Sequence, residues 1–231
     1  MTARVLASLT LVLCPMLGML GCKAGGAAFD PGVPNTDAAM PATSGRYIPL
    51  SVGATWTWSG SDSRSGSSGT SSSTVEALDT LTGPKSGISA FRVHDSTLGG
   101  SVINWQQDTG TSVVRHKEDF YDTSGSLMSD HIYTPSKLRL DESTAHIAMG
   151  ATWTETFTDT STTTATINVQ WTVEAVDEMV TVPAGTFSCL RVHSVESGSL
   201  GYDSTFWYAR NVGKVKETGT ETRNLVGYSI P

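Results

Sequence analysis

Apolar and polar residues alternate along most of the chain beyond residue 50. The longest regular stretch is 163–176, where every second residue is apolar: Ile167, Val169, Trp171, Val173 and Ala175. A period of two is typical of a β-strand with one buried and one solvated face, as in antiparallel sheets. This stretch therefore predicts a long strand in an antiparallel sheet.

Shorter stretches of the same kind lie between turn signals such as Asp108-Thr109-Gly110 and Pro183-Ala184-Gly185. The Ser/Gly run 59–73 is interpreted as a mobile hairpin loop, with a linker as the alternative. Only residues 141–149 suit a short helix, because β-branched Thr and Val fill the rest. Strands are predicted at 55–59, 88–94, 102–106, 111–116, 128–133, 153–158, 178–182, 187–195, 204–208 and 215–220, with a weaker one at 71–77.

Three short phrases occur twice in the same order. GATWT begins at Gly53 and Gly150, TVEA at Thr74 and Thr172, and RVH at Arg92 and Arg191, at offsets of 97, 98 and 99 residues. A slowly drifting offset indicates an internal duplication. We expect two copies of a ~98-residue unit, at 46–142 and 143–231, together forming one continuous β domain.

The pattern at the front of the chain is different. Arg4 and the apolar run Val5–Leu20 resemble a secretory signal, too short for a membrane span. The run ends in Met19-Leu20-Gly21-Cys22, which resembles the lipobox of bacterial lipoproteins. The resemblance implies removal of residues 1–21 and lipidation of Cys22. An ordinary signal peptide followed by an incidental cysteine is the alternative.

Residues 22–45 are rich in Gly, Ala, Pro and Thr, and predict a lipid anchor followed by a flexible tether. Lys23 stands where the lipoprotein resemblance would place Asp for retention in the inner membrane. The implied location is the bacterial cell envelope, at the outer membrane.

Charge and cysteine content narrow the classes of partner. The chain has 22 acidic and 15 basic residues, which argues against a nucleic-acid partner. The small basic clusters Lys137/Arg139 and Lys214/Lys216 are interpreted as solvated strand faces. With Cys14 in the signal and Cys22 lipidated, Cys189 has no partner for an intramolecular disulfide, and we expect a buried, inert thiol.

Three longer phrases carry a family resemblance. They begin at Tyr47 (YIPLSVGATW), Val182 (VPAGTFSCLRV) and Trp207 (WYARNVGKVK). They resemble the YxPLxxGxxW, VPAGTFxCxxV and WYAxxVGxVK phrases of an uncharacterised family of bacterial envelope lipoproteins. The resemblance implies an all-β fold, with an antiparallel curved sheet or open half-barrel. Two β-sandwiches are the alternative.

Tryptophans are the most informative candidates for a binding site. Each buries a large apolar area and seeks a partner for its indole N–H. Core packing explains them most simply, but a curved sheet could also present them to an apolar ligand. The candidate ligand-binding residues are Trp56, Trp105, Trp153, Trp171 and Trp207.

Candidate chemistry is otherwise sparse. His94 and His193 occupy equivalent places in the two copies and could form a pH-sensitive or metal site, although exposed strand residues explain them as well. Neither a complete catalytic motif nor a metal or cofactor motif occurs, so we expect no catalytic residues, metal or cofactor.

The sequence thus favours a non-enzymatic envelope lipoprotein that holds an apolar ligand or lipid in the concavity of its sheet. A structural lipoprotein that binds an envelope protein is the alternative. A hydrolase with a dispersed site is the third and weakest hypothesis.

Overall fold

A computed structural model describes residues 45–198 and 201–231, which belong to one compact unit. The predicted signal peptide, Cys22 and nearly all of the tether lie outside the described residues. No helix within the described ranges is long and apolar enough to cross a membrane. The elements are β1 (Thr55–Asp62), β2 (Ser68–Thr80), the 3₁₀ turn η1 (Gly83–Lys85), β3 (Ser89–Thr97), β4 (Gly100–Asp108), β5 (Ser112–Tyr121), β6 (Leu127–Asp141), β7 (Thr152–Thr160), β8 (Thr164–Val182), β9 (Gly185–Glu196), β10 (Asp203–Ala209), β11 (Gly213–Gly219) and β12 (Glu221–Ser229).

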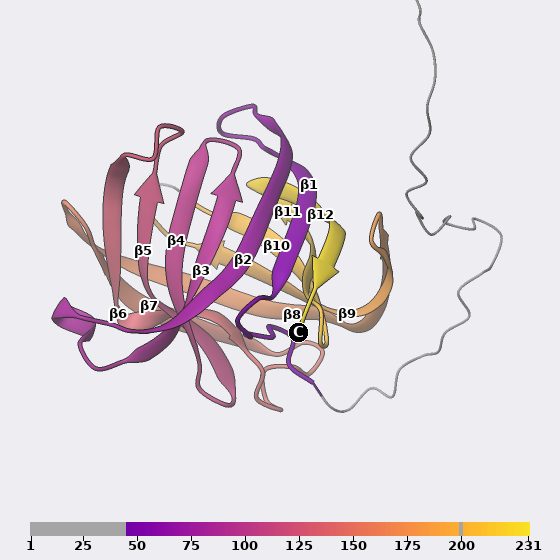
Figure 1. The fold of residues 1–231 in the computed structure, drawn as a ribbon. Helices are drawn as coiled ribbons and strands as arrows, with labels where there is room; N and C mark the ends of the chain where they lie inside the picture. Colours follow the sequence, from indigo (N-terminus) through magenta and orange to yellow (C-terminus); the bar gives the residue numbers. More distant parts are fainter. Residues whose placement is uncertain (1–44, 199–200) are drawn as a thin grey trace, which may run out of the picture. The chain divides into compact units, whose positions relative to one another are not determined.

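The strands form a closed antiparallel barrel in which each strand pairs with its neighbours in sequence (Figure 1). Closure occurs between β1 and β12, where Thr55 lies opposite Ser229 and Asp62 opposite Glu221. The all-β, antiparallel prediction is confirmed. The open half-barrel and the two-sandwich alternative are wrong, because pairing of the first strand with the last satisfies both sheet edges.

Some local predictions were also wrong. The Ser/Gly run 59–73 is not a loop: most of it forms the β1–β2 hairpin, with Trp58 opposite Ser71 and a turn at 63–67. Small side chains can line a barrel wall as well as a loop. Residues 142–151 form turns and bends rather than a helix. Strand β12 was not predicted, because its alternation is weak.

The repeated phrases occupy matching strands in the two halves of the barrel. GATWT leads into β1 and β7, TVEA lies in β2 and β8, and RVH lies in β3 and β9. The irregularities match too: Glu76 and Glu174 are each the extra residue of a bulge against the following strand. His116 and Val215 are likewise extra residues in β5 and β11. Bulges redirect side chains, so the halves share more than strand order.

One end of the barrel is crossed by the segment before β1. The backbone N–H groups of Tyr47 and Ile48 donate to the Glu142 carboxylate, at 3.0 and 3.3 Å. Asn211 N–H donates to the Arg46 carbonyl oxygen at 2.8 Å, and Arg46 forms an ion pair with Asp108. These partners come from three separate turns at this end, so the segment covers it.

Two hydrophobic clusters stabilise the barrel. One surrounds Trp56 and Trp58 and includes Leu225, which is fully buried. The other contains Trp171, with Phe157 and Leu190 almost or fully buried. The predicted alternation in β8 is confirmed, because Val169, Trp171 and Val173 are buried between exposed or half-buried residues.

Candidate functional site

The interior of the barrel holds a cavity of about 670 Å³ that is partly open to solvent. At one end it is lined by Ile48 and Leu50 of the covering segment, and at the other by residues near the turns, including Arg64, Leu98 and Tyr202. Its apolar and aromatic lining residues include Trp56, Trp58, Val75, Val93, Val169, Trp171 and Phe206.

Charged side chains occupy the middle of the same cavity. Arg115 forms an ion pair with Glu118, and Lys214 with Glu217 at 2.5 Å. Both pairs are spaced i, i+3 on strands that hold the same place in the two halves. Although burial opposes ionisation, the charge of Arg115 holds the pKa of Glu118 below its usual range. The cavity is therefore amphipathic rather than wholly apolar.

A third acid, Asp95, faces the cavity without an ion pair. Asn104 Nδ2 donates to its Oδ2 at 2.7 Å, and Ser73 Oγ donates to its Oδ1. Burial raises the pKa of Asp95, and the surrounding guanidinium and ammonium groups oppose the rise only in part. Burial therefore disfavours the ionised form of this acid relative to a solvated aspartate.

The interpretation of two basic clusters as solvated faces was wrong for three of their four residues. Lys137, Arg139 and Lys214 line the cavity, whereas Lys216 lies outside, 4.7 Å from the centroid of the Trp207 ring. A β-bulge explains why the side chain of Arg139 can reach the cavity. Val113 pairs with Leu140 and Val114 with Leu138, so Arg139 is the extra residue, and its side chain can turn inward.

The predicted tryptophans do not form one site. Trp56 and Trp171 line the cavity, as does Trp58, which was not among the candidates. Trp56 Nε1 donates to the Val212 carbonyl oxygen at 2.5 Å. Trp153 stacks between His146 and Trp171, with ring centroids 4.2 and 5.9 Å away.

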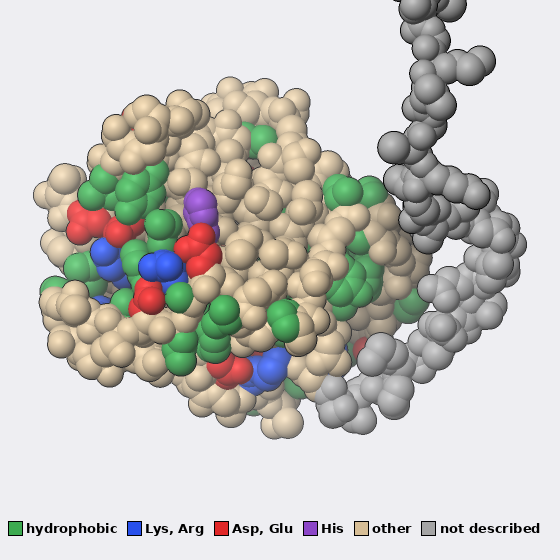
Figure 2. All heavy atoms as spheres, viewed as in Figure 1, with side chains coloured by type: hydrophobic (Ala, Val, Ile, Leu, Met, Phe, Trp, Pro, Cys, Tyr) green, Lys and Arg blue, Asp and Glu red, His purple; other side chains and the backbone are tan. Residues whose placement is uncertain are grey.

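Trp105 and Trp207 instead belong to a cluster that is repeated on the outer side of the barrel wall, where Trp207 is itself buried. Trp105 Nε1 donates to Asp79 at 3.0 Å, and Trp207 Nε1 donates to Glu178 at 3.2 Å. Lys117 lies 4.8 Å from the Trp105 ring centroid, as Lys216 lies over Trp207. Figure 2 shows acidic, basic and histidine side chains gathered on the face of the first half.

The histidines also belong to these clusters. Glu76 binds both Arg92 and His94, each at 3.1 Å. In the second half Glu174 binds Arg191 at 3.0 Å and lies 3.7 Å from His193. Each histidine therefore faces carboxylates of its own half of the barrel: Glu76 for His94, and Glu174 and Asp203 for His193. The two histidines are not brought together. Within the described ranges no group of three or more His, Cys, Asp or Glu residues could hold a metal ion.

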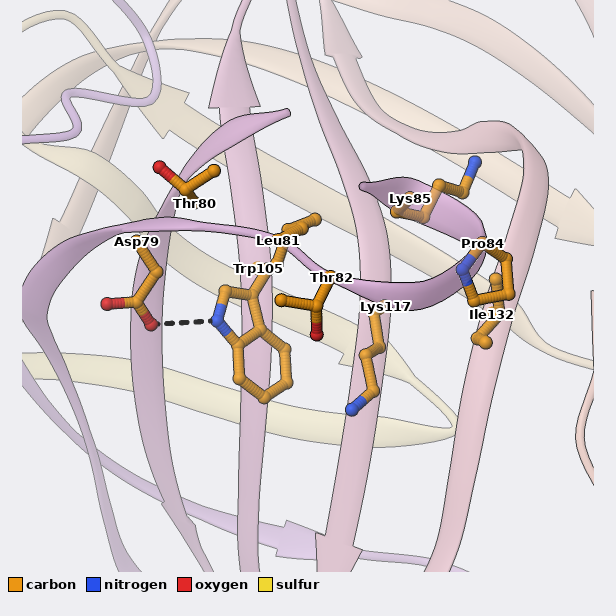
Figure 3. Close-up of a pocket in the computed structure, with 9 residues that line it drawn as sticks. All are labelled: Asp79, Thr80, Leu81, Thr82, Pro84, Lys85, Trp105, Lys117 and Ile132. Carbon is orange, nitrogen blue, oxygen red and sulfur yellow. Dashed lines mark hydrogen bonds between the residues drawn. The ribbon is translucent and has the colours of Figure 1, made fainter. Parts of the chain in front are cut away.

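A smaller cavity of about 290 Å³ lies beside Trp105 (Figure 3). The segment after β2 forms one side of it, and the side chains of Lys85 and Lys117 lie along it. Trp105 therefore faces this outer hollow and not the barrel interior. The sequence offered no signal for it, because the segment with Pro84 folds over β4 only in the tertiary structure.

Cys189 is buried, and burial together with Glu178 raises the pKa of its thiol to about 12. This agrees with the expected buried thiol.

Fold and interior together define a closed, twelve-stranded antiparallel barrel with an amphipathic internal cavity. The DUF3108-like family model matches residues 107–230, which is more than half of the chain, and the chain belongs to this family. No curated protein matches the chain.

Two solved structures are similar. One is a candidate lipoprotein from Parabacteroides distasonis, with a TM-score of 0.42 and 13% identity, covering 80% of this chain and 99% of that one. The other is a candidate exported protein with a YmcC-like fold from Bacteroides fragilis, also with a TM-score of 0.42 and 13% identity. That match covers 81% of this chain and 100% of the other.

Proposed function

We propose that this protein is a non-enzymatic binding protein that holds a molecule with a substantial apolar part inside its barrel. The observation that carries the proposal is the cavity of about 670 Å³ inside the barrel, lined by Trp56, Trp58 and Trp171. Small-molecule sites are typically concavities of about 300–1,000 Å³ with a mainly apolar lining and a few fixed polar groups. Of the candidate tryptophans, Trp56 and Trp171 are assigned to this site directly, and Trp153 supports Trp171 through its stacked ring.

The two ends of the barrel suggest the direction of entry. The segment at Tyr47 and Ile48 is fixed by hydrogen bonds across one end. The opposite end carries the hairpin turns near Arg64, Leu98 and Tyr202, which line the cavity there. Turns hold fewer packed side chains than the strands and are the easier part to displace. We assign ligand entry to this second end.

The proposed location is the bacterial envelope, with lipid on Cys22 anchoring the protein at the outer membrane. It is supported by the apolar run that ends in Met19-Leu20-Gly21-Cys22. Several acyl chains on one cysteine hold a protein firmly on a bilayer, since each buried methylene contributes about 0.8 kcal/mol. Metabolic labelling with an alkynyl palmitate should mark the wild type and not Cys22→Ala. Equal labelling of both would refute the anchor.

We also propose that the barrel arose by duplication, with copies at 46–142 and 143–231. The support is that matching phrases, matching bulges and matching ion pairs lie six strands apart. The interior has diverged, because Ser73 and Asp95 of the first half occupy the places of Trp171 and Ser194 in the second. The two copies thus contribute different side chains to one cavity.

The test is to export residues 43–231 without the anchor and record a native mass spectrum. Residues 43–231 are the compact unit that contains every described strand. The expected result is excess mass that organic extraction releases as a hydrophobic molecule. A bare mass, together with no uptake of added lipids, would contradict the proposal and favour a structural or partner-binding lipoprotein.

A further inference from the structure

Arg139 holds an unusual position in the barrel wall. Its neighbours Lys137 and Leu138 also line the cavity, although adjacent residues of a regular strand point to opposite faces. The bulge between β5 and β6 resolves the conflict by adding one residue opposite Val113 and Val114. The chain thus departs from regular pairing at the point where it turns a guanidinium inward.

This guanidinium has no ion-pair partner in the part of the chain that the structure describes. Among the described residues, no carboxylate forms an ion pair with Arg139, no hydrogen bond is made by its side chain, and its Nε is buried without an acceptor. Its neighbours are engaged elsewhere. Arg115 pairs with Glu118, and Lys214 pairs with Glu217. Burial and the charge of Arg115 lower the pKa of Arg139, and the charges of Glu118 and Asp95 oppose this only in part.

Arg139 differs from the other cations in this part of the cavity, because each of them has a carboxylate partner. Arg115 pairs with Glu118, Lys214 with Glu217, and Arg223 with Glu221. A buried charge without a partner costs free energy. We therefore expect an arginine held there by a bulge to pair with an anion that comes from outside the chain. The cations are Arg115, Arg139, Lys214 and Arg223, and the carboxylates are Asp95, Glu118, Glu217 and Glu221.

We infer that the ligand is an anionic amphiphile whose carboxylate or phosphate group pairs with Arg139 while its apolar part lies along the tryptophan-lined wall. A guanidinium presents a planar fork of donors that matches either head group. The inference rests on the proposed function, since it names the class of ligand for the same cavity.

Bromine quenches tryptophan fluorescence on contact, and Trp56, Trp58 and Trp171 all line the cavity. The full chain would therefore be reconstituted in phosphatidylcholine vesicles and titrated with ω-bromoundecanoic acid, ω-bromoundecyl phosphate and ω-bromoundecanol. Empty vesicles give the correction for partitioning. We expect at least one of the two anions to bind about tenfold more tightly than the alcohol. Comparing the acid with the phosphate identifies which head group the cavity prefers.

Arg139→Gln should abolish this preference by weakening the anion about tenfold and leaving the alcohol unchanged. Arg139→Lys should retain part of it, because the charge remains. Arg92→Gln is the matched control: it makes the same change in net charge on the outer surface, where Arg92 pairs with Glu76. Thermal melting of each variant establishes that it is folded. If Arg139→Gln does not fold, Arg139→Lys carries the test.

The outcomes separate the two proposals. Absence of quenching by all three probes would overturn the proposed function. Equal affinities for anions and alcohol in the wild type would overturn only the anionic head group. A preference that survives in Arg139→Gln, or a loss of alcohol binding in that variant with a normal melting curve, would overturn the role of Arg139. If Arg139→Lys must carry the test, an unchanged tenfold preference or none at all would overturn it.

Discussion

The side-chain amide of Asn104 donates a hydrogen bond of 2.7 Å to the Asp95 carboxylate, and Asn104 is buried in the barrel wall while Asp95 is half-buried. Replacing Asp95 with Asn should keep an acceptor for Asn104 and offer an N–H group to Ser73 Oγ. Because burial raises the folded pKa of Asp95 above its unfolded value, Asp95 stabilises the fold only at low pH. That stability is lost as the pH rises through the folded pKa.

Asp95→Asn should therefore raise the free energy of unfolding at pH 7 by about 1–2 kcal/mol, the cost of a poorly solvated polar group. The gain should shrink below pH 4. Urea denaturation at both pH values measures it. Asp130→Asn is the control, because Asp130 is exposed and should change stability by less than about 0.5 kcal/mol. If Asp95→Asn is less stable than the wild type at pH 7, the Asp95 carboxylate stabilises the fold as a counter-ion for the nearby cations.

Cys189 should be unreactive in the folded protein. Its thiol is buried and its pKa is raised to about 12, so almost no thiolate exists at pH 8. Maleimide should label the peptide containing Cys189 only after urea unfolding, and peptide mapping distinguishes this cysteine from the others. Rapid labelling without denaturant would show that the β8–β9 hairpin opens readily.

Leu190→Ala should lower the free energy of unfolding by about 2–5 kcal/mol. Leu190 is fully buried in the cluster around Trp171, and its truncation leaves a cavity. Leu127→Ala is matched in chemistry but lies on the exposed surface, where we expect about 0.5 kcal/mol or less. Chemical denaturation of both variants makes the comparison. Equal losses would indicate that the barrel wall near Leu190 is loosely packed.

Glu76→Gln and Glu174→Gln should have similar effects, about 0.5–1 kcal/mol each. Each glutamate binds an arginine and faces a histidine at the partly exposed outer surface. The clusters share no partner, so the double variant should lose the sum of the two effects. Thermal and urea unfolding of the wild type, the two single variants and the double variant completes this double-mutant cycle. A strongly non-additive result would reveal coupling across the barrel.

Much of the strand order could be read from the sequence. The alternation around Val169 and Trp171 is strong because one face of β8 meets the core and the other meets water. Strands β1 and β2 were only partly predicted, because serine and glycine give no contrast between faces. The division of 163–182 into two strands was also wrong: Asp177, with a φ of 58°, interrupts the pairing without ending β8.

Part of the candidate site could be predicted as well. The tryptophans were identified from their size, but the sequence could not separate Trp171, which faces the interior, from Trp105, which faces the outer hollow. Arg139 could not be found, because a period of two assigns it to the face opposite Leu138. Only the pairing of Val113 and Val114 with the partner strand creates the bulge that turns Arg139 inward.

The sequence by itself determined the antiparallel β class, the repeated phrases and a buried Cys189, because these depend on local alternation and composition. The tertiary structure alone decided that the sheet closes, that Tyr47 and Ile48 cover one end, and that Arg139 and Lys214 face the interior. These features depend on pairing between distant residues, such as Thr55 with Ser229. Register and bulges set such pairing, and a one-residue shift moves a side chain to the other face of the sheet.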